Sequence, residues 1–361
     1  MDVPILANAP ADMSFLPALT ARRRARALAV LVAAALIGVV LCLQYGTEQI
    51  PLPELARILL APGAATDSAA GVSPAVIVWE VRLPRLLLAF LVGASLAAVG
   101  VALQALLRNP LADPYILGIS SGAALGAALA LQFGLAWAIG GFTAVQLCAF
   151  LFAAATIVAI YRIAVADGRI PVQTLLLAGV IINAILSALI LFITSLSDST
   201  SAFRLFFWLM GSLATLGYAG LGALAVTAVV GIGVLCAQGR NLNLLSLGDD
   251  PAQGLGLDVE RVKRVIFVTT ALLTGAAVAV SGLIGFVGMI GPHAVRMVLG
   301  PDHRLLLPAS ALVGGTFLAV ADTVARSLLA PAELPVGVIT ALCGGPFFIY
   351  LLMSHRKEAI G

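Results

Sequence analysis

The sequence predicts an all-α protein that crosses a lipid bilayer many times. Two observations carry this prediction: an unusually apolar composition, and long apolar segments that recur along the chain. Hydrophobic residues make up 61% of the 361 residues and charged residues only 10%, against roughly 25% charged residues in soluble domains. A soluble core cannot bury so many apolar side chains, whereas the hydrocarbon of a bilayer can surround them.

Ten apolar segments follow one another along the chain. A helix needs about 20 predominantly apolar residues to cross the hydrocarbon. The segments, some of them shorter than this, are 27–45, 86–107, 114–133, 136–161, 172–197, 216–237, 264–284, 286–299, 305–330 and 335–353. The first is too long for the core of a signal peptide, and no small-residue cleavage site follows it. We therefore predict ten transmembrane helices, the first of them retained.

The basic residues orient these helices. With the N-terminus in the cytoplasm, the inner segments carry 15 of the 20 lysine and arginine residues, in accordance with the positive-inside rule. An odd number of spans would place Arg356 and Lys357 outside. We therefore expect both termini in the cytoplasm, with a cytoplasmic tail over residues 1–26 and a single transmembrane domain over residues 27–361.

The chain lacks the phosphate-binding loop that P-loop ATPases use to hydrolyse ATP. Neither of its two lysines, Lys263 and Lys357, lies in a phosphate-binding GxxxxGK[ST] loop. The only basic run is short and N-terminal, which is a poor match to nucleic-acid binding. We expect a protein that is not an enzyme, with no catalytic residue and no metal site.

Ionisable residues are scarce within the predicted spans and fall late in the chain. They are His293, Arg296, Asp322 and Arg326. Asp322 and Arg326 are four residues apart on one helix face, which suits a structural ion pair at least as well as a proton relay. Few intramembrane charges favour the wall of a passage over an ion-driven pump, so we expect another chain to supply the energy.

The longest inner loop, residues 241–264, is predicted to be folded. Two aspartates before a proline are typical of a helix start, and Gly254 and Gly256 would end that helix. Asp258 would begin a second short helix. Two short helices would form a compact docking surface. The alternative is a solvated connector, but the leucine and glycine content is unusual for a free linker.

Four stretches together carry a resemblance to a known family. They are residues 82–127, which begin RLPR and contain RNPLADP; LLLAGV at 175–180; LSLGDDPAQGLGL at 245–257; and residues 282–352, which contain GMIGPHAVR. In order and spacing they resemble the permease family of ATP-binding-cassette (ABC) importers for iron chelates and vitamin B12, the FecCD/BtuC-like, type II permeases. Nearly the whole chain after the N-terminal tail takes part.

The resemblance implies a permease domain that forms a homodimer with its passage along the two-fold axis. It implies two ATPase subunits, which use ATP and magnesium, and a periplasmic substrate-binding protein. This chain itself would bind no cofactor and would lie in the inner membrane. The resemblance further implies that the loop around residues 247–264 couples to the ATPase. The residues carried over to this role are Leu247, Gly248, Asp249, Asp250, Gln253, Gly254, Leu255 and Gly256.

Matching positions also imply docking and gate residues. Arg82, Arg85 and Arg326 would dock the binding protein at the outer mouth; otherwise they pair with lipid or with nearby acids such as Glu80, Asp322 or Glu333. The translocation gates would contain Asn109 and Leu111 in one loop and Val172 and Gln173 in another. The family often has small hydroxyl residues at the second gate, so this chain departs from it there. We interpret His293 as structural rather than as a haem ligand.

The predicted function is transport of an iron chelate, a ferric siderophore or haem, across the inner membrane by alternating access. Iron is favoured by its frequency in the family and by no particular residue. A cobalamin permease of the same family is the alternative. Further alternatives are an ion-coupled secondary transporter, a passive channel and a membrane scaffold.

Overall fold

The computed structural model describes residues 21–46, 48–60, 73–165, 169–213, 216–330 and 332–358. Most of the predicted N-terminal tail, residues 1–20, lies outside the described residues. The described part is almost entirely helical. Its first half contains α1 (Ala21–Gln44), α2 (Leu52–Leu60), α3 (Pro74–Val76), the π-helical turn η2 (Ile77–Arg82), α4 (Leu83–Leu106), the 3-10 turn η3 (Pro114–Leu117), α5 (Ile119–Gln132) and α6 (Ala144–Ala164). Its second half contains α7 (Val172–Leu196), α8 (Ser199–Leu209), α9 (Tyr218–Ala237), α10 (Gly239–Leu245), α11 (Asp249–Gly254), α12 (Val259–Ser281), α13 (Val287–Leu299), α14 (His303–Ser327) and α15 (Val336–Glu358).

Each of the ten predicted apolar segments coincides with a helix. Within the described residues, seven helices are long and apolar enough to cross a membrane: α1, the continuous run Pro74–Leu106, α6, α7, α9, α12 and α14. Three shorter apolar helices, Ile119–Gln132, Val287–Leu299 and Val336–Leu351, match the remaining predictions. The prediction of a polytopic, all-helical protein is confirmed. The number of spans and the side on which each terminus lies stay predictions.

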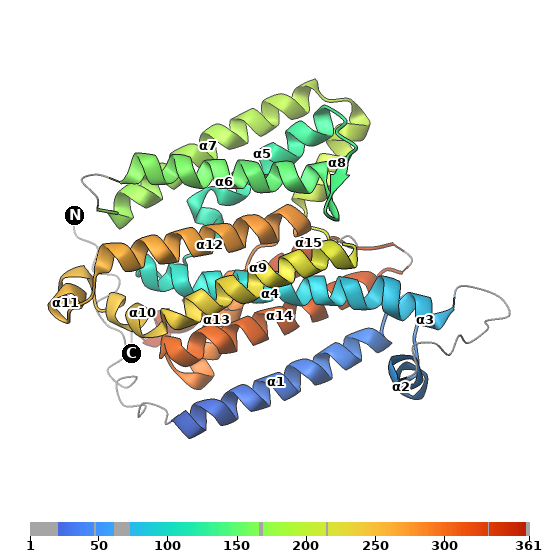
Figure 1. Cartoon of the computed structure of the whole chain (residues 1–361), viewed down its shortest axis with the longest axis horizontal. Helices are drawn as coiled ribbons and strands as arrows, with labels where there is room; N and C mark the ends of the chain where they lie inside the picture. The colour runs from blue at the N-terminus through green and yellow to red at the C-terminus, as the bar shows by residue number, and fades with distance from the viewer. Residues whose placement is uncertain are drawn as a thin grey trace.

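The helices form a bundle around α4 (Figure 1). In the Pro74–Leu106 run, 83% of an 18-residue apolar stretch is buried inside the chain, compared with 11% in α7. Helices α9, α12, α13 and α14 pack against α4, while α5 to α8 form a second group beside α12 and α1 lies at the opposite edge. The apolar helix faces left exposed, as on α7, fit a lipid-facing or subunit-facing position.

Small residues bring the central helices together. A Cβ on Gly100 in α4 would lie 1.8 Å from the carbonyl oxygen of Gly288 in α13. A Cβ on Gly93 would lie 2.3 Å from the carbonyl oxygen of Gly314 in α14. Close backbone approach through small residues is how membrane helices gain packing energy where lipid removes the hydrophobic drive. These glycines therefore set the positions of α13 and α14 on α4.

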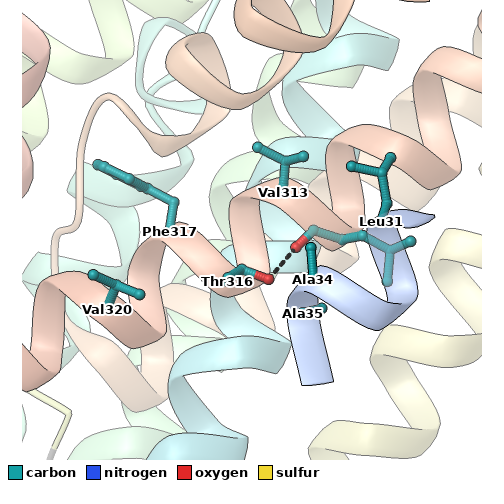
Figure 2. Close-up of a pocket in the computed structure, with 8 residues that line it drawn as sticks. Leu31, Ala34, Ala35, Val313, Thr316, Phe317 and Val320 are labelled. Atoms are coloured by element: carbon teal, nitrogen blue, oxygen red, sulfur yellow. Dashed lines mark hydrogen bonds between the residues drawn. The ribbon is translucent and has the colours of Figure 1, made fainter. Parts of the chain in front are cut away.

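Helix α1 packs on α14 in the same way but less deeply. A Cβ on Gly38 would lie 3.0 Å from the Cγ2 atom of Thr316. The two helices leave a shallow apolar pocket of about 350 Å³ lined by Ala34, Ala35 and Val313, among others, as Figure 2 shows. The Thr316 hydroxyl donates to the Leu312 carbonyl at 2.8 Å, so the one polar group there is satisfied within its own helix.

The predicted span 136–161 begins too early. Residues 138–143 form a hairpin of two short antiparallel strands, β1 (Ala138–Ile139) and β2 (Phe142–Thr143). Gly140 and Gly141 make its turn at φ values of 61° and 86°, as a tight hairpin turn requires. Thr143 and Gln146 then form a capping box at the start of α6. The sequence is apolar here, but the glycine pair and the capping box fix the start of the helix at Ala144.

Candidate functional site

The predicted coupling loop is folded into two short helices, but not the two expected. They are α10 and α11, which both precede Asp258. Asp258 caps the long helix α12 instead, because its Oδ1 atom accepts the Arg261 N–H at 3.1 Å. The prediction of a second short helix after Asp258 is therefore wrong. The helix start at Asp249 and the helix end near Gly254 are confirmed.

Helix α11 begins at a glycine that no other residue could replace without strain. Gly248 has a φ of 115°, which side-chain-bearing residues rarely adopt. Its carbonyl accepts the N–H of Ala252 at 3.1 Å, and the Ala252 side chain is fully buried. One side of α11 is thus packed against the rest of the chain.

The other side of α11 is open. Leu247 is 61% exposed and Leu255 is 62% exposed, and Asp250, Gln253, Gly254 and Gly256 are exposed with them. A Cβ built on Gly254 or Gly256 would meet nothing within 4 Å. These residues lie outside the long apolar helices, so lipid does not explain the exposure of the two leucines. An apolar surface with exposed main chain outside the membrane is typical of a protein contact.

A buried lysine holds α11 to the bundle. Lys263 in α12 is 2% exposed, and its Nζ atom lies 2.6 Å from Oδ2 of Asp249 and 3.6 Å from Oε1 of Glu260. Nζ also donates to the Ile170 carbonyl at 3.4 Å. The Ile170 N–H in turn donates to Oε2 of Glu260 at 2.7 Å. Ile170 lies two residues before α7, so one cluster joins α11, α12 and the start of α7.

The first predicted gate loop is an ordered turn after α4. Asn109 accepts the Leu111 N–H on its side-chain oxygen at 2.9 Å, and Leu111 itself is 45% exposed. Asp113 then accepts the Tyr115 N–H at 3.0 Å and caps η3. Burial raises the pKa of the Asp113 carboxyl to about 6, although the Tyr115 N–H opposes this rise.

The second predicted gate pair lies at the start of α7. Val172 is half-buried and Gln173 exposed. In the described part of the chain no hydrogen bond joins this pair to Asn109 or Leu111. The turn η3, which follows the first gate loop, packs on α7, the helix that begins with the second gate pair.

Arg82 is buried and bound to main-chain oxygens. It is 3% exposed, and its guanidinium donates to the carbonyls of Leu43 at 2.8 Å and Gln44 at 3.2 Å, and to that of Glu48. These groups lie at and after the end of α1, where helical carbonyls have no partner within the helix. The side chain expected at the outer surface thus caps α1.

The other two arginines of the predicted docking set share one aspartate. Arg85 donates to both carboxylate oxygens of Asp322 at 3.0–3.2 Å, and to Glu333 at 2.9 Å. Arg326 donates to Asp322 at 3.1 Å. Asp322 is 1% exposed and Arg326 6%, whereas the Glu333 side chain is 51% exposed. The pair predicted from the spacing of Asp322 and Arg326 is confirmed, and Glu333 is the accessible member of the cluster.

His293 contacts two aromatic rings of α15. Its ring lies edge-on to Phe347 and Phe348 in α15, with centroid separations of 5.8 and 6.2 Å. This contact joins α13 to α15.

Three residues of the site, Lys263, Glu260 and Ile170, were not predicted to contribute from the sequence. The signal available was that a lysine is rare in an apolar helix and is seldom buried without a partner.

A bundle of apolar helices with an anchored, exposed segment outside them is consistent with a multi-pass membrane protein that has a docking segment. The chain belongs to the FecCD transport family, because the model of that family matches residues 34–354. It is 46% identical over 285 residues to the cobalamin import system permease protein BtuC of Halobacterium salinarum, covering 79% of this chain and 75% of that protein. It is 43% identical over 291 residues to the hemin transport system permease protein HmuU of Yersinia pestis, covering 79% and 85%.

A solved structure agrees with these relatives. An inward-facing conformation of a metal-chelate type ABC transporter superposes with a TM-score of 0.77 at 33% identity, covering 91% of this chain and 99% of that one. The resemblance inferred from the sequence motifs is confirmed. The chain is a multi-pass membrane protein and an ABC importer permease of the FecCD family, and its relatives are transport subunits rather than enzymes.

Proposed function

We propose that this chain is the membrane-spanning subunit of an importer for a metal chelate and that Leu247–Gly256 is where its ATPase binds. One observation carries the proposal: α11 is fixed to the bundle by Lys263, yet presents two exposed leucines and two open glycines on its other side. A rigid attachment on one side and an exposed apolar surface on the other suit a segment that transmits force from a partner.

The assembly we propose is a homodimer with its passage on the two-fold axis. Two ATPase subunits, which use ATP and magnesium, bind on the cytoplasmic side, and a periplasmic binding protein delivers the substrate. Each chain crosses the inner membrane ten times with both termini in the cytoplasm. The coincidence of ten helices with the ten predicted segments supports this topology.

The contacts of Lys263 supply a route from ATPase to gate. A displacement of α11 would act through Asp249 on Lys263, and through Ile170 on the first turn of α7. That turn holds Val172 and Gln173, which we propose as one gate; Asn109 and Leu111 form the other. ATP binding thereby switches the passage between its outward and inward openings.

At the opposite end we propose that the binding protein docks over Arg85, Arg82 and Arg326. Arg85 is the member of this set best placed for direct contact, because its partner Glu333 is exposed and could be replaced by an acidic residue of the binding protein. Arg82 and Arg326 are buried and position the surface. Charges at such a rim mainly set the association rate.

The substrate we propose is an iron chelate, a ferric siderophore or haem. The similarity to the hemin permease of Yersinia pestis supports haem in particular. Cobalamin is the second candidate, favoured by the 46% identity to the Halobacterium salinarum permease. Measuring which ligand co-purifies with the proposed partner binding protein would separate the two.

Transport in proteoliposomes tests the function. With the ATPase and binding protein present, we expect ATP-dependent uptake of one of haem, ferric siderophore or cobalamin. Uptake driven by an ion gradient without the ATPase would instead establish a secondary transporter, and flux without any partner would establish a channel.

The substitution Gly254→Trp tests the ATPase site. A side chain at this position points into open space, which is the space that the ATPase would fill, so the substitution should abolish ATPase binding. Gly222→Trp, at an equally open glycine of α9, is the matched control and should bind normally.

A further inference from the structure

An open cavity of about 580 Å³ with several polar side chains in its lining lies between the end of α4, α10 and the start of α14. It lies beside the coupling segment, since a Cβ built on Gly248 would be 3.4 Å from a guanidinium nitrogen of Arg108. The polar side chains that line it include Gln104, Arg108, Asn243, Arg296, Asp302 and Arg304. None of these residues belongs to the predicted coupling, docking or gate sets, although the gate residue Asn109 also contributes to the wall.

The charges around this cavity do not balance. Among the described residues that line it are three arginines, with Asp302 as the single carboxylate. Asp302 is already paired with Arg304 at 3.2 Å. Among the residues that the structure describes, no carboxylate lies within 4 Å of the guanidinium of Arg108 or Arg296. Two cationic groups therefore face the same cavity without an anionic partner among the described residues.

Arg296 is held in place rather than free to leave the cavity. One of its Nη atoms donates to the Gln104 side-chain oxygen at 2.9 Å, and the Gln104 amide donates on to the Gly288 carbonyl at 3.4 Å. Gln104 is 4% exposed, so this support is buried. The remaining N–H groups of the half-buried Arg296 guanidinium need an acceptor, because burying an unpaired charge is unfavourable.

Arg108 is placed by the backbone. Its φ of 49° lies in the left-handed region, which a residue with a side chain adopts at a cost of about 1 kcal/mol or more. This conformation ends α4 and starts the Asn109 turn. The exposed Arg108 side chain and the half-buried Arg296 side chain both line the cavity.

We propose that this cavity binds a phosphate-bearing anion, held by Arg108 and Arg296. A planar guanidinium donates two parallel hydrogen bonds to phosphate oxygens, and two guanidiniums match the charge of a phosphate better than that of a single carboxylate. The phosphate can come from a phospholipid headgroup or from a soluble phosphate. The cavity lies where helices α4 and α14 end and begin, which is the level at which headgroups meet a membrane protein.

A bound anion would join two parts of the proposed transport machinery. Arg108 adjoins Gly248 at the start of α11, and Asn109 belongs to the first gate loop. Occupancy would fix Arg108 and thereby the turn that connects them. The binding itself does not depend on the proposed transport function, because it is measured on the full chain without ATPase or binding protein.

The test compares the purified full-length chain with Arg108→Gln, Arg108→Lys and the control Arg240→Gln. Arg240 is exposed on α10 and does not line the cavity. One arm measures retention of phosphatidylglycerol against phosphatidylcholine by native mass spectrometry, from nanodiscs made with equal amounts of each. The other arm titrates inorganic pyrophosphate and follows the thermal unfolding midpoint.

We expect Arg108→Gln to weaken binding about tenfold, since it removes a charge-assisted contact, and Arg108→Lys to keep part of it. Arg240→Gln should bind as the wild type does. Selective retention of phosphatidylglycerol would identify a lipid headgroup, and stabilisation by pyrophosphate alone a soluble phosphate; either result supports the proposal. The proposal fails if wild-type protein prefers neither, or if Arg240→Gln weakens binding as much as Arg108→Gln.

Discussion

The Nζ atom of Lys263 lies 2.6 Å from Oδ2 of Asp249, and this contact is the ion pair that ties the exposed helix α11 to the bundle. The lysine is 2% exposed whereas the Asp249 side chain is 36% exposed. A pair with one buried member behaves unlike a surface salt bridge, because removal of the exposed member leaves a charge in the interior. The contact therefore fixes α11 more firmly than its six residues could by themselves.

Replacing Lys263 with methionine should loosen α11 without unfolding the bundle. Methionine keeps the unbranched apolar stem but loses the contacts to Asp249 and Ile170. Amide hydrogen exchange over residues 249–254 should rise at least about tenfold, which corresponds to about 1.4 kcal/mol. Arg261→Met, on an exposed position of the same helix, is the control. Equal protection in both variants would show that packing around Ala252 alone holds α11.

Substitution of Gly248 by alanine should be destabilising, while substitution of Gly254 should not. The φ of 115° at Gly248 imposes strain of about 1–3 kcal/mol on alanine. Gly254 is helical with open space around it, so alanine there is neutral or stabilising by up to about 1 kcal/mol. Thermal unfolding of the two variants in detergent measures the difference. Equal midpoints would contradict the assignment of strain to Gly248.

Gly100→Ala should separate α4 from α13. A Cβ would lie 1.8 Å from the Gly288 carbonyl oxygen, and two backbones must move to accommodate it. We expect a loss of roughly 3 kcal/mol in stability. Gly233→Ala in α9, where nothing lies within 4 Å of the added Cβ, should stay within about 1 kcal/mol of wild type. Denaturant unfolding monitored by fluorescence provides the comparison.

The stability of the chain should depend on pH between about 4 and 6 through Asp113. This carboxyl lies in the connection between α4 and α5, outside the membrane-crossing helices, and burial raises its pKa from 3.8 to about 6. The folded state therefore holds the proton more tightly than the unfolded state, so stability falls as pH rises through this window and is level above it. The full effect is about 3 kcal/mol.

Asp113→Asn removes the ionisation but keeps an acceptor for the Tyr115 N–H. This variant should be more stable than wild type at pH 7 and equal to it near pH 4. Unfolding midpoints at the two pH values measure the difference. A constant offset between the proteins at both pH values would show that Asp113 does not titrate in this range.

The sequence predicts the helices well where hydropathy alone decides. Apolar length locates α4, α7 and α12 to within a few residues, because a bilayer demands that length. Hydropathy does not distinguish an apolar strand from a helix, so the hairpin before α6 is absorbed into a predicted span. Helix α8 is missed although Asp198 caps it, because its eleven residues are too few for a span.

Sequence motifs locate the candidate site but not the contacts within it. The LSLGDDPAQGLGL motif identifies α11, whereas the partner of Asp249 lies 14 residues further on and that of Arg82 lies 39 residues earlier. Arg82 illustrates the limit. A guanidinium near the predicted outer surface suits docking as well as it suits a helix cap, and only the fold shows that the end of α1 lies within its reach.

The open side of α11 has a consequence for partner exchange. Around Gly254 and Gly256 the surface is main chain rather than side chain, and peptide groups are the same in every protein. A contact with peptide groups therefore depends little on the amino-acid sequence of this segment. An ATPase from a related transporter should therefore bind at the proposed site on α11 readily. A foreign binding protein should bind less readily at the charged end formed by Arg85 and Glu333, because the identity of each side chain matters there.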